Sequence, residues 1–182
     1  MKMLVHRIEE SAALPFDLEQ LKLHLRVSDN AEDAAIQNIG LTAATELEQF
    51  AQIALITQTI RVTIFSPTKE YGLRLPIGPV AFDHQPTVTI DGEAFSGFDF
   101  DGGNRPYIRW LASYHDLTPD RINIEYEAGF GLTESSVPAD LSQALLDQAA
   151  LHYDGRSPMD AKSLTTSPHM ARVGARYRGV QA

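Results

Sequence analysis

Apolar residues recur at helical spacing in three stretches of the chain. The first covers residues 17–26, where Asp17 is in position to cap a helix. Its stripe is Leu18, Leu21 and Leu25. The second covers residues 31–52, and its stripe is Ile36, Ile39, Ala43, Leu47 and Phe50. At about 1.5 Å per residue this second helix is roughly 30 Å long, so we expect it to be the spine of the fold.

A third helix is predicted over residues 137–154. Ser136 can cap it, Pro138 falls in the first turn, where its missing N–H is tolerated, and Gly155 is placed to end it. Its stripe is Leu141, Leu145, Ala149 and His152, with Leu146, Ala150 and Tyr153 beside it. Residues 28–30, Ser-Asp-Asn, are expected to break the first helix and to cap the second.

Between the second and third helices the apolar period changes to two. Over residues 57–65, Ile60, Val62 and Ile64 share one face of a predicted strand. Further short strands are expected at 73–75, 80–82, 87–90, 98–100, 107–111 and 121–126. Pro, Gly and Asp-rich turns separate them. The pattern predicts an antiparallel β region over about 57–127, inserted between helices that pack together.

Residues 157–182 differ from the rest of the chain. Pro158, Pro168, Gly174 and Gly179 interrupt them, and apolar residues are sparse. We expect an arm that is flexible in the isolated chain and orders on a partner. The predicted fold is therefore α+β: a small helical bundle with an inserted antiparallel β region, together residues 1–156, and an extended C-terminal arm, residues 157–182.

Charge is unevenly distributed between body and tail. The chain has a net charge of −9, yet residues 160–182 carry four basic residues against one acidic residue. An acidic body argues against duplex DNA as the main ligand, because phosphate binding needs clustered Lys and Arg. The basic tail can still contact DNA or an acidic protein surface.

Composition excludes several classes of chemistry. The 182-residue chain has no cysteine, which rules out disulfides, thiolate nucleophiles and cysteine-bound zinc. No apolar run approaches the roughly 20 residues that span a bilayer, and the first residues lack a signal-peptide core. We expect the chain to fold in the cytoplasm of the cell that makes it and to have no membrane partner.

We find no catalytic residue, metal site or cofactor motif. The six histidines are scattered, without the i, i+4 pair of a helical zinc site. Residues 99–104 begin like a calcium loop, but Asn104 replaces the required Gly and Trp110 the required Glu, so a β-turn is expected. Asp29, Glu32 and Asp33 are explained by helix capping. Phosphate-binding loops and nucleophile elbows are missing from the sequence.

The tail holds the candidate binding residues. Arg and Tyr are frequent interface anchors, and the docking set that we expect is Lys162, His169, Arg172, Arg176, Tyr177 and Arg178. A solvated basic tail remains the alternative interpretation.

Several motifs, in order along the chain, resemble the phage head–tail connector (adaptor) family. Residues 18–27 with the acidic residues that follow resemble its opening, and residues 54–59 its junction from long helix to first strand. Residues 73–80, Leu-Arg-Leu-Pro-Ile-Gly-Pro-Val, resemble its longer, β-inserted branch. Residues 126–131 and 137–145 resemble its final strand and following helix, and 152–156 its helix end. The resemblance covers about 17–156; residues 91–120 and the tail carry no such pattern.

The resemblance implies a structural role in the virion, at the head–tail junction. Such connectors are described as rings beneath the portal, matching its twelve-fold symmetry and extending the DNA channel toward the tail. The implied partners are the portal protein, a tail-side stopper, further copies of the chain and the packaged DNA, and the source can be a phage, a prophage or a gene transfer agent. We expect residues 157–182 to dock the ring onto the portal.

Three alternatives stay open. One is another assembly ring protein, such as a stopper or tail-end component. Another is a small enzyme, which would need a convergent polar constellation. A third is a carbohydrate-binding β module, which would present clustered exposed aromatic residues, whereas Trp110 is the only tryptophan.

Overall fold

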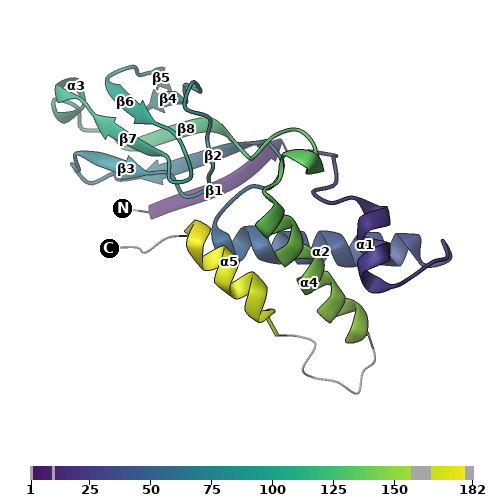
Figure 1. Ribbon diagram of the computed structural model, residues 1–182. Helices are drawn as coiled ribbons and strands as arrows, with labels where there is room; N and C mark the ends of the chain where they lie inside the picture. The colour runs from purple at the N-terminus through teal and green to yellow at the C-terminus, as the bar shows by residue number, and fades with distance from the viewer. Residues whose placement is uncertain (1, 10, 157–164, 179–182) are drawn as a thin grey trace. The chain divides into compact units, whose positions relative to one another are not determined.

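The chain forms two compact units, each made from two separate parts of the sequence. The computed structural model describes residues 2–9, 11–156 and 165–178. The β unit comprises Met1–Ser11 and Thr57–Phe130, and the helical unit comprises Ala12–Ile56 and Gly131–Ala182. Helices and antiparallel sheets confirm the predicted α+β class (Figure 1).

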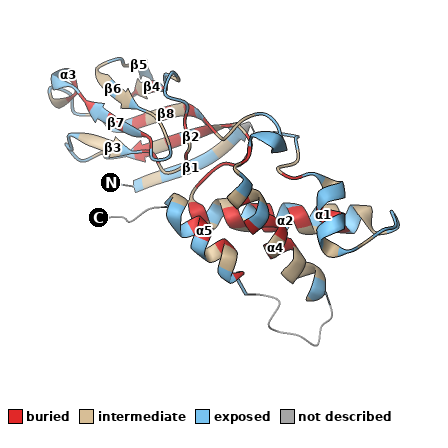
Figure 2. Ribbon diagram, viewed as in Figure 1, coloured by how far each residue is buried: buried red, intermediate tan, exposed pale blue. Residues whose placement is uncertain are grey.

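The helical unit is organised around helix α4 (Ala139–Asp154). Helix α4 packs against α1 (Leu18–Leu25), α2 (Asp33–Ala51) and α5 (Pro168–Arg178). Because it is surrounded, α4 is buried on several sides, at Leu141, Ala144, Leu145, Leu146, Gln148 and Ala149. Figure 2 shows the buried residues of α2, α4 and α5 gathered where these helices meet. The predicted pairing of the long helix with the third helix is confirmed.

The helix ends agree only in part with the predicted caps. Asp17 caps α1 as expected, and its Oδ1 accepts a hydrogen bond from Gln20 N at 2.8 Å. Helix α2 instead begins after Glu32 without a side-chain cap, while Asp29 Oδ1 accepts from Ala31 N within the preceding turn. A short 3₁₀ helix, η1 (Glu134–Ser136), precedes α4, so Ser136 does not cap it.

The β unit contains two antiparallel sheets. The larger has the order β1-β2-β8-β4-β5, and the smaller the order β3-β7-β6. Their bounds are β1 (Lys2–Glu9), β2 (Gln58–Phe65), β3 (Gly72–Arg74), β4 (Thr87–Ile90), β5 (Glu93–Ala94), β6 (Phe98–Asp101), β7 (Tyr107–Trp110) and β8 (Arg121–Ala128). A one-turn helix, α3 (Ala112–His115), follows β7.

The central register explains the core of the larger sheet. Ile60, Val62 and Ile64 of β2 face Tyr126, Ile124 and Ile122 of β8, and all six side chains are buried. The alternation predicted for β2 is therefore confirmed. Two expectations are corrected: β1, an unpredicted strand from the start of the chain, belongs to this sheet, and residues 80–82 form only a single bridge between Val80 and Gly103.

The expected extended arm is also corrected where the structure describes it. Residues 168–178 form α5, which buries Met170, Val173 and Gly174 against the other helices. Two of the residues that we interpreted as breakers are compatible with this helix. Pro168 is its first residue, where a missing N–H costs nothing, and Gly174 allows the ring of Phe50 to approach closely. Residues 157–164 and 179–182 lie outside the described residues.

Candidate functional site

The N-terminal end of α5 is fixed by a buried polar contact with α4. Ser167 precedes the helix, and its Oγ accepts a hydrogen bond from Met170 N at 2.9 Å, as a capping side chain does. The Ser167 N–H donates to Gln148 Oε1 at 2.7 Å, and Gln148 Nε2 donates to Glu46 Oε2 of α2 at 2.8 Å. This chain of contacts ties three helices together, and none of it was anticipated from the sequence.

His169, one of the expected docking residues, is engaged inside the helical unit. Its Nδ1 lies 2.6 Å from Asp147 Oδ2, and His24 Nε2 of α1 lies 3.3 Å from Asp147 Oδ1. Asp147 therefore joins α1 and α5 to α4. A carboxylate between two imidazoles holds these helices in place, and His169 is already occupied by this contact.

Arg176 and Tyr177 converge on Asp140, in the first turn of α4. Arg176 Nη2 lies 2.8 Å from Asp140 Oδ2, and Tyr177 Oη donates to Asp140 Oδ1 at 3.0 Å. Partial burial raises the pKa of Tyr177, and the Asp140 carboxylate raises it further. Arg176 still exposes about 62% of its side chain, so it can also meet a partner.

The remaining expected docking residues divide into two groups. Arg172 and Arg178 are exposed, and neither has an ion-pair partner among the described residues. Lys162 lies outside the described residues. The structure thus brings five of the six onto one helix, and it leaves Arg172, Arg178 and part of Arg176 as an exposed cationic surface.

The buried charge of Lys22 has a structural explanation. Its Nζ lies 2.9 Å from Asp33 Oδ1 and 3.4 Å from Glu19 Oε1, while its side chain is about 4% exposed. The hydrogen bond to Asp33 raises the pKa of Lys22, against the lowering effect of burial. Glu32 is similarly held by Arg156 and Tyr153, and its hydrogen bond with Arg156 is the main reason that the pKa of Glu32 is lowered.

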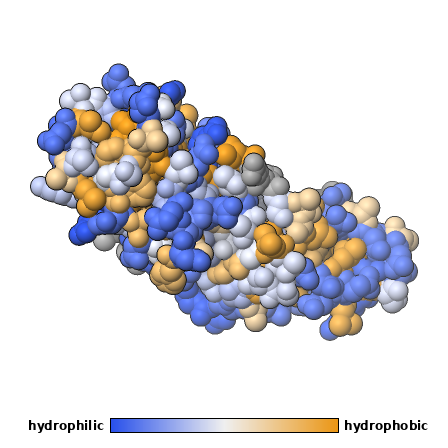
Figure 3. All heavy atoms as spheres, turned by 90° about the horizontal axis from the view of Figure 1, so that it is seen from above, coloured by the Kyte–Doolittle hydropathy of each residue, from blue (hydrophilic) through white to orange (hydrophobic). Residues whose placement is uncertain are grey.

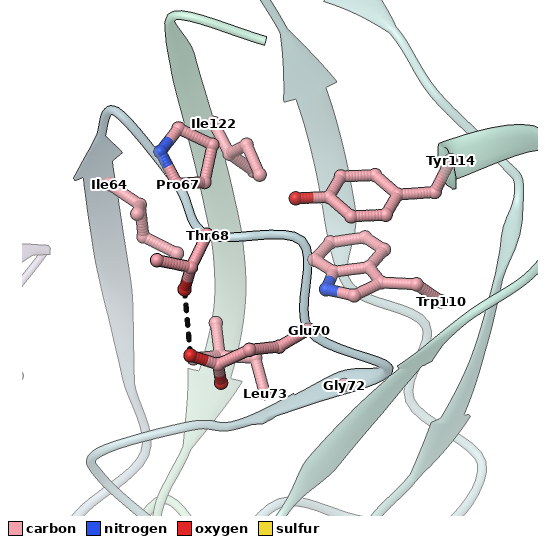
Figure 4. Close-up of a pocket in the computed structure, with 9 residues that line it drawn as sticks. All are labelled: Ile64, Pro67, Thr68, Glu70, Gly72, Leu73, Trp110, Tyr114 and Ile122. Carbon is pink, nitrogen blue, oxygen red and sulfur yellow. Dashed lines mark hydrogen bonds between the residues drawn. The ribbon is translucent and has the colours of Figure 1, made fainter. Parts of the chain in front are cut away.

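A small cavity in the β unit lies under the loop between β2 and β3 (Figure 4). Its volume is about 10 Å³, room for about one water molecule. Trp110 and Tyr114 stack along one wall, with ring centroids 4.5 Å apart, and Thr68 Oγ1 donates to Glu70 Oε1 across from them. This cavity is too small for an organic substrate.

Metal sites and membrane-spanning helices were also sought among the described residues. Over residues 2–9, 11–156 and 165–178, acidic and histidine side chains do not gather into a group able to hold a metal ion. Of the residues that begin like a calcium loop, 99–101 belong to β6 and 102–104 follow it, with Gly103 forming a bridge to Val80. Among the described helices, none has the length and apolarity to cross a membrane. On the face seen in Figure 3, hydrophobic patches are small and broken up by hydrophilic residues.

Comparison with known proteins identifies structural relatives. No protein-family model and no curated protein matches the chain. A chain from the virion of a native gene transfer agent particle superimposes with a TM-score of 0.80 at 26% identity, and the match covers 98% of this chain and 97% of that chain. A chain from the neck of an empty gene transfer agent particle, computed with C6 symmetry, gives 0.75 and 26% with the same coverage. A third, from the neck of the native particle computed with C12 symmetry, gives 0.76 and 25%.

These matches include both units and nearly the full length of each chain. All three relatives come from virion or neck structures and not from enzymes. The chain is therefore similar in fold to chains of gene transfer agent virions and necks, and this similarity supports a structural neck protein of a phage-type or gene transfer agent particle.

Proposed function

We propose that the chain is a structural head–tail connector (adaptor) subunit. In this role it forms a ring beneath the portal and extends the DNA channel toward the tail, without catalysis, cofactor or metal. Its partners are the portal protein, a tail-side stopper, other copies in a twelve-membered ring and the DNA that passes through the lumen. It acts in the virion, at the head–tail junction, after assembly in the host cytoplasm.

The observation that carries this proposal is the full-length similarity to neck chains. One of these chains comes from a neck computed with C12 symmetry. Its match covers 98% of the present chain, with a TM-score of 0.76. A cyclic ring requires each copy to present two different, complementary surfaces, so that contacts close after a full turn. The net charge of −9 suits a channel wall, because a strongly basic lumen would bind phosphates and hinder the passage of DNA.

We assign portal docking to the cationic surface of α5 and the adjoining tail. The expected set was Lys162, His169, Arg172, Arg176, Tyr177 and Arg178, and its free charges among the described residues are Arg172 and Arg178. Guanidinium groups pair bidentately with carboxylates, so the matching portal surface is acidic. The anchoring contacts of His169 and Tyr177 hold these arginines in one orientation, which reduces the entropy lost on docking.

A pair of matched variants tests this docking role. The double variant Arg172→Ala/Arg178→Ala should bind DNA-free portal about tenfold more weakly, since two charge-assisted contacts are lost. The control Arg105→Ala/Arg121→Ala removes the same charge from exposed positions of the β unit and should bind like the unchanged chain. Equal binding by the α5 variant and the unchanged chain would refute the docking role. Weaker binding of DNA alone would instead assign the arginines to the channel.

A further inference from the structure

Strand β1 presents a long open edge. It has eight residues and pairs with β2 on one side, while no described strand pairs with its other side. Three of its apolar side chains, Leu4, Val5 and Ile8, are 37–39% exposed. Soluble proteins seldom leave such an edge uncovered, because its free N–H and C=O groups pair readily with another strand.

Strand β6 is an open edge of the smaller sheet, and its charged side chains are acidic. It pairs only with β7 among the described strands, and its residues alternate as Phe98, Asp99, Phe100 and Asp101. Asp99 contacts Arg109 on β7, with 3.1 Å between Asp99 Oδ2 and Arg109 Nε. Asp101 is exposed and has no ion-pair partner within the described part of the chain. β1, in contrast, exposes the basic side chains of Lys2 and His6.

The two edges lie on opposite flanks of the β unit. Phe98 of β6 shares a surface groove with Val88 of β4, which is separated from β1 by two strands of the larger sheet. Figure 1 shows β1 on one flank of this unit and β4, β5 and β6 on the other. Edges so placed cannot pair within one chain, but they can pair head to tail between neighbouring copies, which is the contact that builds a closed ring.

We infer that β1 of one copy pairs with β6 of the next copy, so that each larger sheet continues into the smaller sheet of its neighbour. This inference rests on the proposed ring and names the contact that would build it. The occupant of each edge is a second copy of the chain.

The side chains of the two strands match on both faces. Met3 and Val5 lie on the face of β1 that looks toward the buried residues of β2, since they pair with Ile64 and Val62. Phe98 packs edge-on against buried Trp110, so Phe98 and Phe100 lie on the inner face of β6. The inner faces can therefore bring Met3 and Val5 toward Phe98 and Phe100, while Arg7, which pairs with Ile60, stands at the far end of the same face. The outer faces bring Lys2 and His6 toward Asp99 and Asp101. Pairing of β1 with another β1 would instead bring basic residues together.

The absence of cysteine from the chain permits a direct test by disulfide trapping. Leu4→Cys combined with Asp101→Cys tests one register of the pairing, and Leu4→Cys with Asp99→Cys tests a register shifted by two residues. All three positions are exposed, so the substitutions leave the core intact. The melting temperature of each variant and the mass of its assembly are first compared with those of the unchanged chain. Each variant is then assembled on the portal of the same particle, oxidised mildly and run on a denaturing gel.

The pattern on the gel distinguishes the possible pairings. One of the two double variants should give a ladder of disulfide-linked oligomers, because every copy then carries both cysteines and can be linked to a neighbour on each side. A mixture of the two matching single variants should stop at dimers. The control Leu4→Cys/Thr118→Cys, with Thr118 exposed elsewhere in the unit, should stay monomeric. The β1–β6 pairing would be refuted if rings form but neither double variant gives a ladder, or if Leu4→Cys alone gives homodimers. Either result would still be compatible with the proposed ring. If the unchanged chain forms no ring, the proposed function fails first and the inference with it.

Discussion

Helix α5 should contribute substantially to the stability of the helical unit, and Met170 is the residue to test. Its side chain is about 2% exposed between α5 and its neighbours. Met170→Ala removes buried apolar atoms and leaves a cavity, which typically costs about 2–5 kcal/mol. Alanine recovers a few tenths through its helix propensity, and an eleven-residue helix can shift to fill part of the gap. We therefore expect a loss of about 2–3 kcal/mol in the free energy of unfolding.

Urea denaturation followed by circular dichroism at 222 nm measures this loss, because every described helix except the one-turn α3 lies in the helical unit. With an m-value of about 2 kcal/mol per molar, the midpoint should fall by about 1–1.5 M. Arg172→Ala is the control: it changes an exposed residue of the same helix and should cost under about 0.5 kcal/mol. If both variants shift the midpoint equally, α5 is a loosely attached tail and the packing described above is wrong.

Three further changes test other parts of the structure. Gly40→Ala would place a Cβ 2.4 Å from the ring of Phe16. Thermal melting should therefore show a loss of about 1–2 kcal/mol in the free energy of unfolding, although alanine has the better helix propensity. Adding Phe16→Leu to the same chain should restore part of this loss. Lys22 has a raised pKa in the folded state. The stabilisation that its ion pairs give to the folded state is fully present below the unfolded pKa of about 10.4, and it is lost as the pH rises through the folded pKa. Urea midpoints should therefore fall above about pH 10.5 in the unchanged chain, and an equal fall in Lys22→Met would contradict this assignment. EDTA should leave the melting temperature unaltered, and a clear drop would reveal a metal site.

The sequence predicted the helices and strands that bury one regular apolar face. Helices α1, α2 and α4 were identified because each places a stripe of apolar residues against the others, and β2 because its core face alternates strictly. Strand β1 was missed because Met3, Leu4 and Val5 are consecutive apolar residues on an edge, so no burial pattern of period two marks them. An edge strand is recognised by the strand it pairs with, and here the paired residues lie at least fifty positions away in the sequence.

The sequence pointed to the basic and aromatic residues of the tail as a candidate site, but it did not predict how they are arranged. The basic and aromatic residues of the tail were identified from charge and spacing alone. Their anchoring to Asp140 and Asp147 depends on contacts between residues 22 to 37 positions apart, which local pattern does not encode. Helix α5 was interpreted as an arm because Pro168 and Gly174 are usual helix breakers, although one stands at the first helical position and the other gives room to Phe50.

The mass of the complex between the purified chain and its bare portal tests the central claim most directly. Light scattering should show the portal gaining about 240 kDa, which corresponds to twelve copies of the 20.1 kDa chain. A chain that adds no mass to the bare portal, but binds once another neck protein is present, would belong to the stopper or tail-end class. A chain that joins neither assembly would contradict the connector role altogether.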